Sequence, residues 1–414
     1  MSEMNISILE KEVLATIDGD EVVAFLQAII QQRSDYPPGD CRAAVTVVAE
    51  KLSGANVAFE LASREEHQPN LIASLGGDQG GRTRLMYHSH IDTVSPGELE
   101  RWSVDPFGGE IKDGYIYGRG AGDDKGSVAA QTMALVALAR AGLQLASPLR
   151  LVVVSDEEFG GLNGTHWLHS EGVLQTDALV VGEQTNNHVA IAERVACGID
   201  LTVYGKSAHG ATPWEGENAV LKAARALVWL QEKLFPQLGA RTHPYLPPPS
   251  LCVCKIAGGL QWGIVPERCK VEMDRRLVPG ETRETAMQEI RHLLDEFSAQ
   301  VEPLQYELYS SGEVAANIDT PPGDPFVTLA NRALESVSGE SRPLIGYVQT
   351  SDGRWFAKDG IPIIIFGPSV PAVAHAADEH VSIDQLVEAT RFLTLLAMRR
   401  LGIYDQKGAE YGTV

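Results

Sequence analysis

The sequence is poor in cysteine, in positive charge and in long hydrophobic runs. Its 414 residues include five cysteines, an odd number that is too small for a disulfide scaffold and suits a reducing compartment. Lysine and arginine total 34 against 55 acidic residues, giving a formal net charge of -21, so a phosphate backbone would be repelled from most of the surface. This balance argues against nucleic acid as a partner.

The sequence shows no targeting or membrane segment. Its first residues, MSEMNISILEKEVLATIDGDE, lack the basic region and the apolar stretch of a secretory signal. No later hydrophobic run is long enough to span a bilayer. We therefore expect a cytoplasmic protein that does not associate with membranes.

Two of the cysteines form a C-x-C pair in the stretch SLCVCKI. Cys252 and Cys254 are separated by one residue in an alternating run, so both should face the same side of a strand. Without a second pair of cysteines, this arrangement is more typical of core packing than of a zinc site. We expect both thiols to lie in the protein interior.

Short aliphatic runs closed by polar residues or glycine alternate with helical patterns over much of the chain. Four runs predict buried strands: TRLMYHSH, LRLVVVSD, TDALVVGE and GIPIIIFG. Apolar residues at helical spacing occur in EVVAFLQAIIQQ, RAAVTVVAEKL and SVAAQTMALVALARAG. This alternation predicts a three-layer α/β domain with a mostly parallel sheet.

The pattern changes near Cys197. Four segments alternate with the two-residue period of a sheet that has one exposed face: GIDLTVYG, PSLCVCKIAGG, CKVEMDRRL and LQYELYS. They are separated by the helical patterns NAVLKAARALVWLQEKL and ETAMQEIRHLLDEFSAQV. The order predicts a smaller α+β domain of the βαββαβ, ferredoxin-like type in residues 197–309, inserted into a larger domain formed by residues 1–196 and 310–414.

Histidine and carboxylate side chains recur at the ends of the predicted strands. They are His90 and Asp92 after the first strand, Glu157 and Glu158 after the second, Glu183 after the third, and His375 after the fourth, with Asp123 and Asp124 before a helix. Each fragment alone has an ordinary explanation as a hydrogen-bonded pair, a solvated turn or a structural histidine. Ligands of open α/β sheets bind outside the carboxyl ends of the strands, so the conjunction predicts one shared cleft.

The crowding of acidic groups in that cleft indicates a metal site. Five or more carboxylates would repel one another unless cations neutralised them. Two histidines with three carboxylates are too many ligands for one tetrahedral ion, and they suit a pair of ions that share a bridging carboxylate. Mixed histidine and carboxylate ligands favour Zn²⁺, Mn²⁺ or Co²⁺ over Mg²⁺ or Ca²⁺.

Seven motifs, taken in order, resemble those of the M20 family of co-catalytic metallopeptidases and amidohydrolases, which includes acetylornithine deacetylase, succinyl-diaminopimelate desuccinylase, aminoacylases and glutamate carboxypeptidase. The motifs are YHSHIDTV, WSVDPFGGEIKDGYIYGRGAGDDKG, SDEEFGG, VVGEQT, GKSAHGATPWEGENAV, DRRLVPGET and GPSVPAVAHAADEHV. The resemblance covers nearly the whole chain. It implies that the larger domain is catalytic and that the inserted domain acts as a lid and pairs two subunits into a homodimer.

The resemblance implies a role for each residue of the cleft. Asp123 would bridge two divalent metals, expected to be zinc with cobalt or manganese as alternatives. His90 and Glu183 would complete one shell, and Glu158 and His375 the other. Asp92 would orient a ligand imidazole. Asp124 falls in a variable slot, where a carboxylate favoured by the helix dipole is a sufficient interpretation. Family members also usually hold the peptide after the bridging aspartate in cis, so we expect a cis bond between Asp123 and Asp124.

The same resemblance implies hydrolysis of an amide bond. The metals would lower the pKa of a bridging water, Glu157 would take its proton and pass it to the departing amine, and His209 of SAHGATP would stabilise the charge on the carbonyl oxygen. The variant Glu157→Ala tests this role, because it should abolish turnover and leave the metal content intact.

Two features of the inserted domain concern the substrate. Arg276 matches the family arginine that holds a substrate carboxylate, although an ion pair with Glu272 or Glu281 is an alternative. The family pattern G-G-x-x-x-N-x-V-P is here GGLQWGIVP, with Gly263 in place of the asparagine and Trp262 beside it. This departure suggests an unusual leaving group, aromatic or apolar in character.

The identity of the substrate follows less directly. By the resemblance, a glutamate at position 183 favours deacylases and carboxypeptidases over aminopeptidases and dipeptidases. We therefore expect a small N-acyl amino acid or a related amide as substrate. The sequence D-D-K-G also occurs among dipeptidases. TSDGRWFAKDG resembles the T-S-D-G-R stretch of desuccinylases. A dipeptidase or carboxypeptidase is therefore the alternative. A more distant alternative is a binding protein that keeps the fold without the chemistry.

Overall fold

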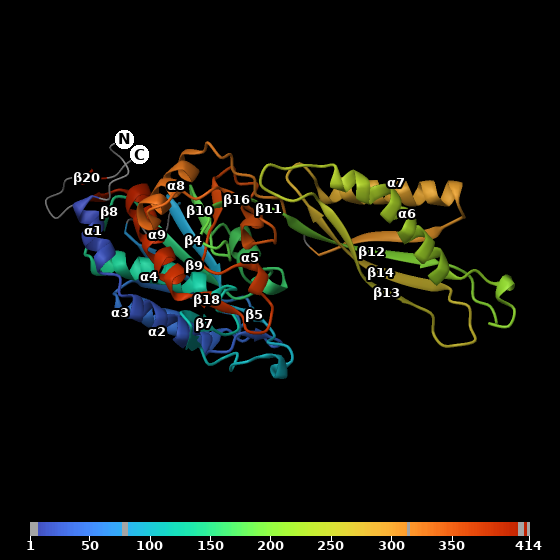
Figure 1. Ribbon diagram of the computed structural model, residues 1–414, viewed down its shortest axis with the longest axis horizontal. Helices are drawn as coiled ribbons and strands as arrows, with labels where there is room; N and C mark the ends of the chain where they lie inside the picture. The colour runs from blue at the N-terminus through green and yellow to red at the C-terminus, as the bar shows by residue number, and fades with distance from the viewer. Residues whose placement is uncertain (1–6, 77–81, 313–314, 405–409, 412–414) are drawn as a thin grey trace. The chain divides into compact units, whose positions relative to one another are not determined.

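The computed structural model describes residues 7–76, 82–312, 315–404 and 410–411. These residues form two compact units. The first contains the described parts of residues 1–191, 318–347 and 351–414, and the second contains those of residues 192–317 and 348–350 (Figure 1). None of the described helices combines the length and the apolar character needed to cross a membrane.

The first unit is built on an eight-stranded sheet. Its strand order is β16 (Ile345–Tyr347), β11 (Ala190–Glu193), β17 (Ile363–Ile365), β10 (Leu179–Val181), β4 (Leu85–His90), β9 (Leu149–Val154), β3 (Asn70–Leu75) and β2 (Ala58–Ala62). The four central strands run parallel, whereas β3, β2 and β11 pair in antiparallel fashion. The central strands are the four predicted from the sequence.

Helices cover both faces of this sheet. On one face, α4 (Lys125–Arg140) packs between β4 and α9 (Ile383–Leu401), with α2 (Gly19–Ile30), α3 (Arg42–Gly54) and α8 (Pro325–Ser338) outside them (Figure 1). The Ala-rich sequence of α4 suits this place, because its residues from Lys125 to Leu138 are all buried. On the other face, α5 (Thr165–Ser170) and the 3-10 turn η4 (Asp352–Trp355) close a second apolar layer. The predicted three-layer architecture is confirmed.

Four parallel strands that lie side by side present their carboxyl ends at the same edge. β4 ends at His90, β9 leads into the 3-10 turn η2 (Glu157–Phe159), β10 ends two residues before Glu183, and β17 precedes the segment that carries His375. A small sheet joins two further segments at this edge, since β18 (His380–Ser382) pairs with β7 (Tyr115–Tyr117). The fold therefore gathers the strand-end motifs at one place.

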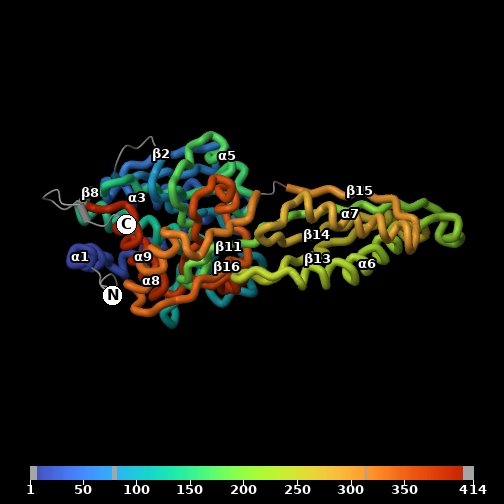
Figure 2. The backbone as a smooth tube through the Cα atoms, turned by 90° about the horizontal axis from the view of Figure 1, so that it is seen from above, coloured from blue at the N-terminus to red at the C-terminus, as the bar shows by residue number. Residues whose placement is uncertain are grey.

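The second unit is a four-stranded antiparallel sheet with two helices. The chain order is β12 (Val195–Tyr204), α6 (Ala219–Gly239), β13 (Ser250–Gly258), β14 (Arg268–Leu277), α7 (Arg283–Gln300) and β15 (Gln305–Ser311), with the strands in the order β13-β14-β12-β15. Both helices lie along the strands (Figure 2). This is the predicted βαββαβ pattern.

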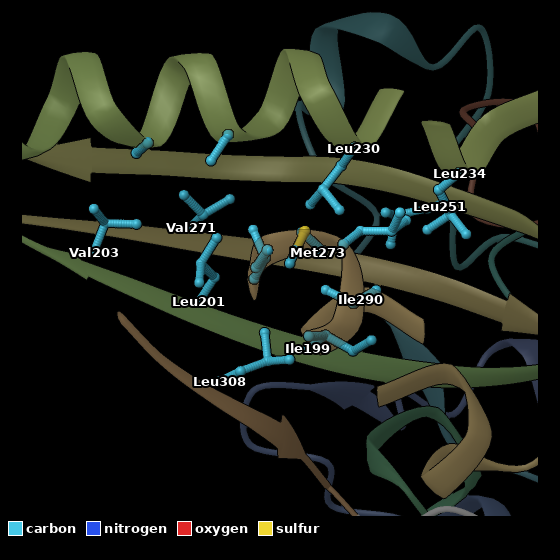
Figure 3. Packing of buried hydrophobic residues seen from close by; sticks show 14 of the residues in the cluster. Ile199, Leu201, Val203, Leu230, Leu234, Leu251, Val271, Met273, Ile290 and Leu308 are labelled. Atoms are coloured by element: carbon cyan, nitrogen blue, oxygen red, sulfur yellow. The ribbon is translucent and has the colours of Figure 1, made fainter. Parts of the chain in front are cut away.

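One face of this second sheet carries the core of the unit. Alternate residues of the strands, such as Ile199, Leu201, Val271 and Met273, meet apolar residues of α6 and α7, including Leu230 (Figure 3). The period of two in the strands explains why the other face remains polar.

The C-x-C pair does not belong to that core. Cys252 and Cys254 are both exposed, whereas Cys41, Cys197 and Cys269 are buried. The prediction that the pair packs in the interior is therefore wrong. Both cysteines lie on β13, which is one of the two edge strands among the described strands of this sheet, and neither contributes to the apolar face.

Candidate metal centre

Two groups of side chains at the carboxyl edge of the first sheet have the arrangement of metal ligands. His90, Asp123 and Glu183 form one group, and Asp123, Glu158 and His375 form the other. Within each group the potential ligand atoms all lie within 4.8 Å of one another. Asp123 belongs to both groups, so a single carboxylate joins them.

The contacts inside the two groups are direct. Nε2 of His90 lies 3.1 Å from Oδ1 of Asp123, and Nε2 of His375 lies 3.2 Å from Oδ2 of the same carboxylate. His375 is also 3.1 Å from Oε2 of Glu158. The two oxygens of Asp123 therefore face different histidines, as a bridging carboxylate requires.

The loop that carries Asp123 comes directly before α4, and the peptide bond between Asp123 and Asp124 is cis, as expected. Asp124 is the N-cap residue of the helix, but its side chain makes no capping hydrogen bond. Close packing explains the nearby glycine of VVGEQT, because a Cβ on Gly182 would lie 2.1 Å from Oγ of Ser89 and 2.8 Å from Oδ2 of Asp124. Glycine at this position lets the end of β10 approach the start of α4.

Asp92 connects the first strand to the turn after the second. Its backbone carbonyl lies 3.0 Å from Nδ1 of His90, while its Oδ1 is 3.5 Å from the same nitrogen. The carboxylate accepts hydrogen bonds from the backbone N–H groups of Glu157 at 3.2 Å and Glu158 at 3.0 Å. Asp92 thus orients the imidazole mainly through its carbonyl and fixes the turn through its side chain.

Burial disfavours the charged forms of several carboxyl groups in this centre. Burial, reinforced by the charges of Asp123 and Asp124, raises the pKa of Glu183 well above its ordinary value. Burial is also the main reason why the pKa of Glu157 rises to about 8 and that of Asp124 to about 7. Carboxyl groups whose charged forms are disfavoured in this way call for cations. The donor set of histidines and carboxylates fits a pair of divalent ions of the zinc, manganese or cobalt type.

The same carboxylates also raise the pKa values of the two histidines. Hydrogen bonds to Asp123 and Glu158 raise the pKa of His375 to about 10. Burial lowers the pKa of His90, but hydrogen bonds to Asp123 and Asp92 outweigh it and raise that pKa well above its ordinary value. The carboxylates therefore favour positive charge at both imidazole positions, which is the same preference that would favour bound cations there.

Glu157 has a partner that the sequence did not reveal. Nη1 of Arg354 lies 2.8 Å from Oε1 of Glu157. Arg354 is in turn held by the carboxylate of Asp352 at 3.2 Å and by the carbonyl of Ser351 at 3.2 Å. The other carboxylate oxygen of Asp352 accepts a hydrogen bond from Thr165 at 2.5 Å. The only sequence signal for Arg354 was its place in the quoted stretch TSDGRWFAKDG.

A buried ion pair supports the loop of Asp123. The carboxylate of Glu379 binds the guanidinium of Arg119, and both side chains are buried. Glu379 also accepts hydrogen bonds from the backbone N–H groups of Gly122 at 2.9 Å and Asp123 at 3.0 Å, while Arg119 donates to the carbonyl of Ala376 at 3.2 Å. The pair therefore connects the Asp123 loop to the segment beside His375. Both residues lie within the quoted motifs, but spacing alone gave them no role.

The hydroxyl of Tyr347 is a further contact of the centre. It lies 2.8 Å from Oε2 of Glu183 and 3.1 Å from Oε1 of Gln184. Tyr347 ends β16 and is buried. It donates a hydrogen bond to a carboxylate of the first ligand group, and nothing in its local sequence predicts that contact.

The remaining predicted residues lie in the second unit. His209 is exposed, and its Nδ1 accepts a hydrogen bond from the backbone of Ala211 at 3.0 Å. The loop of Gly263 runs next to it, since His209 forms an isolated bridge with Ile264 and the carbonyl of Gly263 accepts the N–H of Gly210 at 2.7 Å.

Gly263 has a positive φ of 83°, and Trp262 beside it is 96% exposed. A left-handed backbone explains why glycine suits this position. The indole is therefore free to contact a ligand or another surface.

Arg276 pairs with neither of the acidic residues considered as alternatives. Its Nε and Nη2 both lie 3.0 Å from Oδ2 of Asp274, and its Nη1 lies 3.3 Å from Oγ1 of Thr350. Glu272 is instead paired with Lys255, and Glu281 with Arg241 and Arg275. The alternative of a Glu272 or Glu281 partner for Arg276 is thus wrong, and the guanidinium is held by a shorter acidic side chain two residues before it.

Comparisons with known proteins agree with this geometry. The chain matches the model of Peptidase family M20/M25/M40 over residues 86–399. It is 33% identical over 335 residues to succinyl-diaminopimelate desuccinylase of Rhodospirillum centenum, an alignment that covers 78% of this chain and 82% of that protein.

Solved structures share the fold. The M20 family metallo-carboxypeptidase Sso-CP2 from Sulfolobus solfataricus superposes with a TM-score of 0.75 at 18% identity, covering 93% of this chain and 99% of that chain. A dinuclear metal-binding peptidase of the M20 family from Bacillus subtilis gives a TM-score of 0.70 at 13% identity, covering 92% and 98%. At these identities the likeness shows the fold alone.

The predicted resemblance, fold class and enzyme class are confirmed, because the family match spans most of the chain and includes every residue of both ligand groups. The protein is accordingly a metal-dependent hydrolase of the amidohydrolase type, and the chain belongs to Peptidase family M20/M25/M40.

Proposed function

We propose that this protein hydrolyses the amide bond of a small N-acyl amino acid with the help of two divalent metal ions. The observation that carries the proposal is the shared carboxylate of Asp123, which joins two groups of ligands beside the carboxylate of Glu157. His90, Asp123 and Glu183 would hold one ion, and Asp123, Glu158 and His375 the other. The mixed ligands make zinc the first metal to test, with cobalt and manganese as alternatives.

When bound, the ions would supply positive charge that activates water and polarises the amide carbonyl. The chain's own contribution is to move the proton. Glu157 takes a proton from the attacking water and delivers it to the nitrogen of the departing amine. Arg354 binds Oε1 of Glu157, and we assign the proton transfer to Oε2.

Two residues of the second unit are assigned to the substrate. His209 stabilises the negative charge that develops on the carbonyl oxygen, and its exposed imidazole is available for that contact. Arg276 binds the carboxylate of the amino acid, because its planar guanidinium is held in place by Asp274 and can still offer donors. Gly263 and Trp262 lie beside the His209 loop, where they would contact the leaving group.

The acyl group is the least constrained part of the proposal. The curated relative from Rhodospirillum centenum is a succinyl-diaminopimelate desuccinylase. Succinyl is therefore the first acyl group to test, and acetyl the second.

We further propose a homodimer formed through the second unit. Leu221, Val228 and Phe235 are exposed on α6 at seven-residue spacing, so they form an apolar stripe along one side of the helix. A cytoplasmic location is proposed from the cysteines, all five of which are free thiols.

A substrate panel tests the proposed reaction. Protein loaded with Zn²⁺, Mn²⁺ or Co²⁺ would be assayed for release of free amine from N-succinyl and N-acetyl amino acids, free dipeptides and neutral amides. We expect turnover of the acyl amino acids. Cleavage of free dipeptides alone would establish a dipeptidase instead, and metal binding without any turnover would favour a binding protein.

A further inference from the structure

Cys252 and Cys254 are the exposed cysteines of this chain, and the proposed reaction has no use for them. They lie on β13, whose pairing with β14 is irregular at this point. Cys252 is opposite Asp274 and Val253 is opposite Met273, but the next partner, Glu272, is opposite Lys255. Cys254 is therefore the extra residue of a β-bulge.

The bulge favours contact between the two thiols. In a regular strand, residues two apart have Cα atoms about 6.6 Å apart, since each residue adds roughly 3.3 Å. That separation is near the upper limit for a disulfide, about 6.8 Å. A bulge bends the strand and shortens the separation. Sγ of Cys254 already lies 3.7 Å from the backbone carbonyl of Cys252.

The pKa of Cys254 is consistent with direct contact between the two thiols. The pKa of Cys254 is raised above its ordinary value by local burial, and then by a hydrogen bond to the Cys252 thiol and by its charge. A raised pKa disfavours the Cys254 thiolate, so we assign the resolving step to Cys254 and the attack on peroxide to Cys252.

We propose that Cys252 and Cys254 form an oxidisable dithiol that closes into a disulfide when it meets a hydroperoxide. The Cys252 thiolate attacks one peroxide oxygen, which breaks the O–O bond, leaves a sulfenic acid on Cys252 and releases hydroxide or alcohol. The Cys254 thiol then attacks the sulfenic sulfur, forming the S–S bond and releasing water. In total two thiols are oxidised and one peroxide is reduced.

A short chain of contacts links this dithiol to the proposed carboxylate anchor. Cys252 is directly opposite Asp274, and Oδ2 of Asp274 holds both Nε and Nη2 of Arg276. The second oxygen of Asp274, Oδ1, is buried without a hydrogen-bond partner among the described residues. Packing by the neighbouring strand therefore helps to fix this carboxylate. Closing the ring would displace Asp274 and with it Arg276, so oxidation should raise KM for a substrate with a carboxylate. This consequence rests on the proposed function, whereas the disulfide does not.

Mass spectrometry of the full-length protein tests the site. Protein with its metals bound would be treated with hydrogen peroxide, alkylated and digested. We expect a peptide that contains both cysteines joined within one chain, lighter by about 2 Da than the reduced peptide and restored by dithiothreitol. Buried Cys41, Cys197 and Cys269 serve as internal controls and should remain thiols.

Two variants give the order of events. In Cys254→Ser, a dimedone adduct should appear on Cys252, because the sulfenic acid has no thiol to attack it. In Cys252→Ser, peroxide should produce no disulfide and much less adduct. Free thiols after peroxide, a disulfide between two chains, or separate oxidation of each cysteine to sulfonic acid would overturn the proposal.

Kinetics test the link to Arg276 separately. Oxidation of the wild type should raise KM several-fold for a carboxylate substrate, with kcat little changed, and the same treatment of Cys254→Ser should have no such effect. A disulfide that forms without a change in KM would overturn the link to Arg276 but would still support the oxidisable dithiol. If the protein had no hydrolase activity at all, the proposed function would fail and the mass measurement would still decide whether the dithiol closes.

Discussion

Nη1 of Arg354 lies 2.8 Å from Oε1 of Glu157, in an ion pair that joins the η4 turn to the η2 turn after β9. The side chains of both residues are largely buried, at 10% and 11% exposure. A base that is held by a guanidinium has a fixed direction, which suits a group that must reach water and then the leaving amine. Arg354 is thus a positioning residue for the proposed reaction.

Replacing Arg354 with lysine should lower kcat by about 10- to 100-fold, the usual range for residues that orient a catalytic group from behind. A lysine keeps the charge but loses the fork that binds Glu157, Asp352 and the Ser351 carbonyl together. Steady-state kinetics with a metal assay would check this. Arg342→Lys is the matched control, because Arg342 forms a similar pair with Glu388 in the same unit. Loss of metal from Arg354→Lys would show that it supports the ligands instead.

The Glu379–Arg119 pair predicts an effect on metal affinity rather than on the proton transfer. Glu379→Gln keeps an oxygen for the N–H groups of Gly122 and Asp123 but removes the charge opposite Arg119. We expect the affinity for metal to fall by about 10- to 100-fold. Titration with Zn²⁺ or Co²⁺ measures this, with Glu388→Gln as the control. Unchanged metal affinity in Glu379→Gln would contradict the supporting role.

Tyr347→Phe removes a hydroxyl that donates to Glu183 and keeps the ring. The carboxylate then loses one fixed contact, so we expect metal to bind several-fold more weakly. Tyr87→Phe is a stringent control, because Tyr87 is also buried and donates to a backbone carbonyl, that of Leu393, at 2.5 Å. Both variants should lose some thermal stability, whereas only Tyr347→Phe should change the metal titration.

Arg276→Lys separates substrate binding from chemistry. If Arg276 binds the carboxylate of the amino acid, KM should rise by about tenfold or more, and kcat should change little. A neutral amide substrate should be unaffected. Arg268→Lys, on the same strand, provides the control. Equal losses for acidic and neutral substrates would exclude the carboxylate contact.

The strand-end histidines and carboxylates could be predicted from the sequence because each lies within a few residues of a buried strand, and parallel strands share one edge. The contacts around these residues could not be predicted from the sequence. Arg354 and Glu157 are 197 residues apart, Arg119 and Glu379 are 260 apart, and Tyr347 and Glu183 are 164 apart. Local periodicity carries no information on such pairings.

The prediction for Cys252 and Cys254 was wrong for a different reason. Alternation in SLCVCKI correctly placed Cys252 on one side of a strand, but it could not tell the helix-covered side from the open one. The bulge at Cys254 also breaks the period that the pattern assumes.

The most direct test of the proposed role of Glu157 is the metal content of Glu157→Ala, measured beside its turnover of an N-acyl amino acid. We expect two bound metal ions per chain, as in the wild type, and a fall in kcat of at least about 100-fold, because Glu157 moves the proton and is not a ligand. Loss of a metal ion together with activity would make Glu157 a ligand, and retained activity would remove it from the mechanism.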